Sequence, residues 1–200
     1  MPRRLVPFVA DAYYHIYNRG NNRKQVFFQR ENYLYFLQGI KRYLLPAADI
    51  IAYCLMPTHY HLMVGVKKTS GVVKTPEVSL GMMKLSVSYT KAINKRFERV
   101  GVLFQGPFQS KPILDSTYLL QVCRYIHANP VKDGLVTDPS NWPYSNYLDW
   151  MGERAGTLFD CCFADSQFPD TCDYKDFVTN YLQSKEVPED INNYLGALDA

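Results

Sequence analysis

Two apolar runs joined by a tight connection constrain the fold of this chain most strongly. Residues 50–56 and 59–66 are each long enough for a buried strand, and only Pro57 and Thr58 separate them. Short apolar runs of this kind, bounded by turn residues, are typical of a β-hairpin. We therefore predict that the two runs pair as neighbouring strands.

Further strand and helix patterns lie on both sides of this hairpin. An aromatic-rich run precedes it, followed by apolar residues at helical spacing that end at Pro46. After the hairpin, Asp115 is a good N-cap for a helix that we expect to end near Ala128, ahead of Pro130. The predicted elements are strands at residues 13–18, 50–56, 59–66 and 108–113 and helices at 31–45, 79–99, 115–128 and 174–182.

The order of these elements predicts the fold class. The first seven follow the order β-α-β-β-α-β-α, which is the split βαβ or ferredoxin-like plan. We expect an α+β fold whose antiparallel sheet carries the two longer helices on one face and leaves the other face for a ligand. In helix 79–99, the residues that we expect to face inward are Leu80, Met83, Val87, Ile93 and Phe97.

The net charge of +3 hides a strong asymmetry along the chain. Residues 1–150 contain 19 Lys and Arg against 9 Asp and Glu, whereas residues 151–200 contain 3 against 10. This segregation favours a basic domain at 1–150 that binds a polyanion, with nucleic acid preferred, and an acidic C-terminal extension at 151–200.

The cysteines and the hydropathy indicate the compartment. Five cysteines include no Cys-x-x-Cys pair, which argues against a zinc site or a disulfide framework. No apolar run approaches the ~20 residues of a membrane helix, and the N-terminus lacks the apolar core of a signal peptide. We expect a cytoplasmic protein without a membrane partner.

The second strand of the hairpin contains a candidate metal site. His59 and His61 are two residues apart, so their side chains project from one face of a strand with roots ~6.6 Å apart. Two imidazoles placed in this way can converge on one divalent cation. Taken alone, the pair is also compatible with two structural, half-buried histidines, which is how we interpret His15 and His127.

The helix at 115–128 contains a candidate nucleophile. Tyr125 and Asn129 are four residues apart and therefore neighbours on one helix face. A phenol could attack beside an amide oxygen that completes a His-His-Asn metal site. The alternative is that Tyr125 is an aromatic anchor and Asn129 an ordinary helix-terminal residue. Tyr118, two turns earlier on nearly the same face, is a rival nucleophile.

Four segments occur in an order that resembles a known family. They are residues 14–22 (YHIYNRGNN), 55–62 (LMPTHYHL), 103–106 (LFQG) and 125–136 (YIHANPVKDGLV). Together they resemble the single-tyrosine HUH transposases, specifically the REP-associated tyrosine transposases of bacteria. The resemblance covers about residues 10–150 and implies metal ligands at His59, His61 and Asn129 and a catalytic tyrosine at Tyr125.

The resemblance also implies a reaction and its partners. It implies a single-stranded DNA endonuclease and strand transferase that binds hairpin DNA, nicks it through a 5′-phosphotyrosine and rejoins strands. Mg²⁺ or Mn²⁺ is the implied cofactor, although Zn²⁺ would also bind imidazole. The protein would act as a monomer or a homodimer and would be associated with the nucleoid when bound to DNA.

Basic residues after two of the predicted strands are candidate DNA contacts. They are Arg19, Arg23, Lys24, Lys67 and Lys68. Two positions depart from the family pattern: Pro107 and Phe108 replace a common basic residue after the glycine, and Lys132 stands where arginine is frequent.

Two other functions remain open at this stage. One is a catalytically silent protein that binds hairpin DNA without cutting it. The other is a nuclease of the replication-initiator or relaxase type, although those usually have a third histidine ligand and a longer chain.

Overall fold

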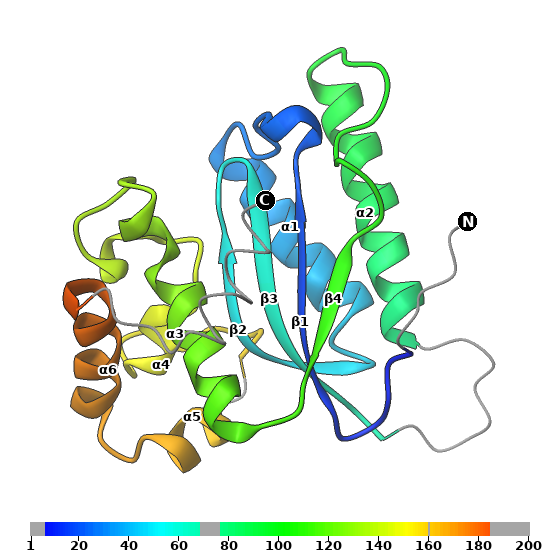
Figure 1. The fold of residues 1–200 in the computed structure, drawn as a ribbon. Coiled ribbons are helices and arrows are strands. Elements are labelled where there is room, and N and C mark those ends of the chain that lie inside the picture. Colours follow the sequence, from blue (N-terminus) through cyan, green and yellow to red (C-terminus); the bar gives the residue numbers. More distant parts are fainter. Residues whose placement is uncertain (1–6, 69–76, 160, 185–200) are drawn as a thin grey trace.

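A four-stranded antiparallel sheet forms the centre of the computed structural model, which describes residues 7–68, 77–159 and 161–184. The strands are β1 (Tyr13–Arg19), β2 (Ala48–Leu55), β3 (His59–Val66) and β4 (Gln109–Ile113). They lie in the order β2-β3-β1-β4, so β3 and β1 are central (Figure 1). This is the strand order of the ferredoxin-like plan, and the predicted fold class and the 57–58 hairpin are confirmed.

Helices α1 (Arg30–Tyr43) and α2 (Glu77–Arg96) pack together against one face of the sheet (Figure 1). The two helices approach closely because each has a glycine at the surface where they meet. A Cβ on Gly39 would lie 2.5 Å from Leu85 Cδ1, and one on Gly81 would lie 2.2 Å from the Tyr43 carbonyl oxygen. The core on this side includes aromatic residues from both helices, such as Phe36 and Tyr89.

The predicted inward face of α2 is largely wrong. Leu80, Met83 and Val87 are 38%, 42% and 48% exposed, and only Ile93 of the predicted set is fully buried. The residues that face the core are Val78, Gly81, Met82, Leu85, Tyr89 and Ile93. The helix has apolar residues on two faces. The face that contains Gly81 packs against the core, because a glycine there allows α2 to approach α1 closely.

The opposite face of the sheet is not left open, contrary to our expectation. Helix α3 (Ser116–Lys132) contacts β2, β3 and β4 on that side. Asp115 caps it by accepting a hydrogen bond from the Tyr118 amide, as predicted. The helix continues through Pro130 to Lys132, beyond the predicted end, and its last turn packs Ala128, Asn129 and Pro130 into the protein interior.

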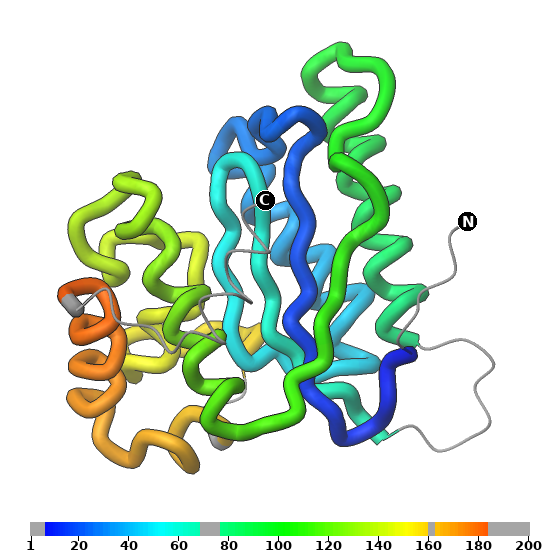
Figure 2. The backbone as a smooth tube through the Cα atoms, in the orientation of Figure 1, coloured from blue at the N-terminus to red at the C-terminus, as the bar shows by residue number. Residues whose placement is uncertain are grey.

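Short helices from the C-terminal third complete this second layer. They are the 3₁₀ helix η2 (Pro139–Asn141) and the α-helices α4 (Tyr147–Trp150), α5 (Cys161–Gln167) and α6 (Thr171–Ser184). A further 3₁₀ helix, η1 (Asn21–Arg23), directly follows β1. Figure 2 shows α6 running beside α3, and the two helices contact each other. The position of α6 confirms the helix predicted at 174–182.

Residues beyond 150 share a core with the preceding chain. Tyr174 of α6 is fully buried, and its hydroxyl lies 2.5 Å from Nδ1 of His127. The other nitrogen of His127 lies 2.9 Å from the side-chain oxygen of Asn146. His127 is thus a structural link between α3 and its neighbours. The division at residue 150 stays a prediction, and residues 185–200 of the acidic extension lie outside the described part. None of the described helices could span a membrane.

Candidate active site

Strand pairing places the two histidines of β3 beside β1. His59 is the cross-strand partner of Arg19, and His61 is the partner of Tyr17. Side chains alternate between the faces of a strand, so Tyr60 enters the core beneath α1 and α2 while His59 and His61 face the side of α3. The i, i+2 spacing therefore brings both imidazoles to one face, as predicted.

The two imidazoles are close but differ in their surroundings. Their ring centroids lie 5.0 Å apart, with the ring planes at 82°. His59 is partly exposed, and its Nδ1 lies 2.9 Å from the hydroxyl of Thr58. His61 is buried, and burial holds its pKa well below the usual value, with smaller contributions from His59, His15 and Arg19. His61 is therefore a neutral imidazole, the form that binds metals.

Tyr125 of α3 lies directly against His61. Its ring centroid is 5.6 Å from that of His61, with the planes at 81°, and the side chain is buried. The aromatic ring of α3 that meets the paired histidines is therefore that of Tyr125. Tyr118 lies in the first turn of the same helix, seven residues earlier and about 10 Å along its axis, which makes it the weaker candidate.

Asn129 lies one helical turn beyond Tyr125 and is also buried. Its side-chain nitrogen donates a hydrogen bond of 3.1 Å to the Tyr125 carbonyl. Because the nitrogen is used in this bond, the amide oxygen is the atom that could bind a cation. The structure thus brings His59, His61 and Tyr125 together and places Asn129 beside Tyr125 on the same helix.

The donor set fits a divalent cation that prefers nitrogen and oxygen ligands. His61 Nε2 is buried, and no group in the described part of the chain forms a hydrogen bond with it. A buried ring nitrogen without a partner is rare in proteins, and a metal ion would account for it. Across residues 7–68, 77–159 and 161–184, no three His, Cys, Asp or Glu side chains are arranged to hold a metal. A cation here would therefore need the Asn129 oxygen or water besides the two imidazoles.

The basic candidates fall into two groups at opposite ends of β3. Arg19 is beside His59, and the exposed Arg23 and Lys24 follow it. Lys67 and Lys68 follow the far end of β3 and form ion pairs of 3.0 Å with Asp49 and 2.9 Å with Asp11. The eight residues of β3 span about 25 Å, so the two groups are well separated.

Three residues near the site had no functional role in the sequence interpretation, which treated His15 as structural. His15 contacts His61 through a ring nitrogen. The ammonium of Lys132 lies 5.1 Å from the Tyr125 ring centroid and donates a 3.1 Å hydrogen bond to the hydroxyl of Tyr181 on α6. The sequence held a signal for His15, because its spacing of two residues from Tyr17 places both side chains on the same face of a strand. No sequence signal links Tyr181 to Lys132.

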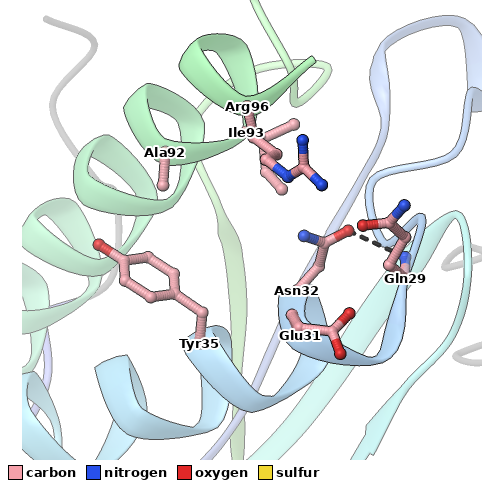
Figure 3. Close-up of a pocket in the computed structure, with 7 residues that line it drawn as sticks. All are labelled: Gln29, Glu31, Asn32, Tyr35, Ala92, Ile93 and Arg96. Atoms are coloured by element: carbon pink, nitrogen blue, oxygen red, sulfur yellow. Dashed lines mark hydrogen bonds between the residues drawn. The ribbon is translucent and has the colours of Figure 1, made fainter.

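A separate cavity lies between α1 and α2 (Figure 3). Its volume is about 260 Å³. The residues that line it are Gln29, Glu31, Asn32, Tyr35, Ala92, Ile93 and Arg96. Since these belong to the other face of the sheet, this cavity is not part of the histidine and tyrosine site.

Comparisons with known proteins identify the family of this chain. The family model described as "Transposase IS200 like" matches residues 8–129. A Haemophilus influenzae protein named as a REP-associated tyrosine transposase is 25% identical over 108 residues, which cover 50% of this chain and 58% of that protein. The match thus spans little more than half the length of this relative.

A solved structure shares the fold. The structure of a REP-associated tyrosine transposase bound to a REP hairpin has a TM-score of 0.61 and 18% sequence identity, covering 80% of this chain and 94% of that one. These comparisons confirm the resemblance that the four segments predicted.

Proposed function

This chain belongs to the IS200-like transposase family, and from this premise we propose that it is a metal-dependent transposase that cleaves and rejoins single-stranded DNA. The nucleophile is Tyr125. His59, His61 and Asn129 hold a divalent cation, Mg²⁺ or Mn²⁺. The observation that carries this proposal is the contact between the Tyr125 and His61 rings within one chain.

The phenol of Tyr125 attacks the scissile phosphate. Its oxygen forms a bond to phosphorus while the bond to the 3′ oxygen breaks, which leaves a 5′-phosphotyrosine and a free 3′-hydroxyl. The phenol proton passes to solvent and the departing oxygen takes one up. Because the phosphotyrosine keeps the energy of the phosphoester, another 3′-hydroxyl can rejoin the strand without ATP.

The surroundings of Tyr125 suit this role. A phenol is a weak nucleophile at neutral pH and needs help from neighbouring positive charge. The ammonium of Lys132 faces the Tyr125 ring, and the Asn129 bond to the Tyr125 carbonyl fixes the final turns of α3. A bound cation would act as a Lewis acid that polarises the phosphate and offsets its developing charge.

The proposed partner is hairpin DNA. The structural neighbour is bound to a REP hairpin, and residues 1–150 of this chain have a large excess of positive charge. Arg19, Arg23 and Lys24 are nearest to His59 and are the first candidates for phosphate contacts. Because the proposed substrate is DNA, we expect this protein in the cytoplasm, at the nucleoid.

Incubation with labelled hairpin oligonucleotides and Mn²⁺ tests the proposal. A covalent protein–DNA adduct that survives denaturation, with a free 3′-hydroxyl on the released fragment, is the expected result. Hairpin binding without cleavage in Mg²⁺, Mn²⁺ or Zn²⁺ would instead identify a catalytically silent DNA-binding protein.

A further inference from the structure

A third histidine lies behind the two proposed metal ligands. His15 is in the middle of β1, is fully buried, and is the cross-strand partner of Met63 on β3. This register makes His15 a diagonal neighbour of His61, a distance that large side chains can bridge. Its Nε2 lies 2.9 Å from Nδ1 of His61, and the ring centroids are 5.1 Å apart.

This hydrogen bond has two possible proton arrangements with opposite consequences. A neutral imidazole has one N–H donor and one acceptor nitrogen. If His15 Nε2 is the donor, the proton of His61 must be on Nε2, where it is buried and has no hydrogen-bond partner in the described chain. If His61 Nδ1 is the donor, His61 Nε2 has a free lone pair.

Only the second arrangement is compatible with a metal at His61. It also avoids a buried, unsatisfied N–H, which would cost about 1–3 kcal/mol. Metal-binding histidines usually donate their other N–H to an acceptor, which fixes both tautomer and ring orientation.

We propose that His15 is a positioning residue, whose Nε2 accepts the Nδ1–H of His61 and so directs the Nε2 lone pair of His61 into the metal site. The assignment rests on the proposed function for the identity of that site. His15 touches neither DNA nor the reacting atoms in this role.

The neighbours of His15 hold its ring in place. Lys111 on β4 is its cross-strand partner. Strand β1 lies between β3 and β4 in the sheet, and His15 is fully buried there. Tyr17 packs beside both imidazoles, with centroids 5.2 Å from His15 and 6.1 Å from His61, and limits rotation of the pair.

Direct Mn²⁺ binding measures this role without any DNA reaction. Calorimetric titration of the full chain with Mn²⁺ should show that His15→Leu, which lacks an acceptor, binds roughly 10–100-fold more weakly than wild type. His15→Gln can place an amide oxygen at the position of Nε2 and should retain most of the affinity. His127→Gln removes another buried histidine from the same side of the sheet and should leave the affinity unchanged.

The tautomer of His61 is a second readout that needs no metal. In the metal-free wild type, ¹⁵N–¹H correlation of the imidazole nitrogens should show the proton of His61 on Nδ1. A proton on Nε2, or unchanged Mn²⁺ affinity in a folded His15→Leu variant, would overturn the assignment. Failure of the wild type to bind Mn²⁺ would overturn the proposed metal site, and the tautomer would still decide the role of His15.

Discussion

Tyr125 and His61 meet edge to face, with ring centroids 5.6 Å apart, although 64 positions of the sequence separate them. One ring comes from the buried face of α3 and the other from a central strand. Because both belong to one chain, the proposed site needs no residue from a second subunit to bring its nucleophile to its histidines.

Replacing the nucleophile should abolish the covalent step while preserving the fold. Tyr125→Phe keeps the buried ring and removes only the hydroxyl, so we expect no protein–DNA adduct with hairpin oligonucleotides on a denaturing gel. Tyr118→Phe is the matched control on the same helix and should form the adduct normally. An adduct that persists in Tyr125→Phe and disappears in Tyr118→Phe would identify the other tyrosine as the nucleophile.

Removing a metal ligand should affect cleavage far more than DNA binding. Lewis-acid stabilisation supplies several kcal/mol, so His59→Ala or His61→Ala should slow adduct formation by more than ~100-fold. Chelation of the wild type with EDTA should have the same effect, and added Mn²⁺ should restore only the wild type. Cleavage in EDTA at the full rate would exclude the proposed metal role.

Local patterns predicted the elements that bring the site together. The 57–58 hairpin, the strand before it and the Asp115 cap are each determined by residues close in sequence, and these alone place the two histidines on one strand face and Tyr125 on a helix. The predicted helix end was wrong because α3 tolerates Pro130 in its last turn, which is buried, although a proline in a helix interior costs ~3 kcal/mol.

Three other contacts between distant segments have no signal in the sequence that identifies the partner. The inward face of α2 depends on how closely Gly81 approaches Tyr43, which a hydrophobic pattern with two apolar faces does not reveal. The role of His15 depends on the β1–β3 register, and that of Tyr181 on where α6 docks against α3. In each case the partner is specified by tertiary packing rather than by spacing.

Lys132 should assist the Tyr125 reaction through its charge. Its ammonium faces the Tyr125 ring at 5.1 Å and is held by Tyr181. If this charge stabilises the transition state by about 1–2 kcal/mol, Lys132→Met should slow adduct formation by roughly 5–30-fold in single-turnover assays.

Two variants separate charge from packing at Lys132. Lys132→Arg keeps the charge and should be much less impaired than Lys132→Met. Tyr181→Phe removes only the oxygen that receives the hydrogen bond and should slow the reaction less than Lys132→Met does. Equal rates for wild type and Lys132→Met would show that this cation has no part in the reaction.

The salt dependence of DNA binding should distinguish the two basic groups. Each phosphate contact on single-stranded DNA contributes about 0.7 to the slope of log affinity against log salt concentration. The double variant Arg23→Gln and Lys24→Gln should therefore reduce the slope by about 1.4. Lys67→Gln and Lys68→Gln are the matched control, because these lysines are paired with acids at the far end of β3. A reduced slope only in the second pair would place the DNA along the opposite end of the sheet.

Buried histidines should make folding stability depend on pH between about 6.5 and 5. Burial lowers the pKa of His15 to about 3 and of His127 to about 4, and it holds that of His61 well below the ordinary value. In the unfolded chain these groups take up protons near pH 6.5, whereas the folded protein does not. As the pH falls, the unfolded state therefore binds more protons than the folded state does. The free energy of unfolding decreases as a result, by up to about 1.4 kcal/mol per pH unit for each histidine. Urea denaturation of the metal-free protein at pH 7.5, 6 and 5 measures this loss. The His127→Gln variant has one buried histidine fewer, so its free energy of unfolding should depend less steeply on pH than that of the wild type. Stability that stays constant across this range would mean that these rings take up protons at the same pH in the folded and the unfolded protein, so that burial does not lower their pKa.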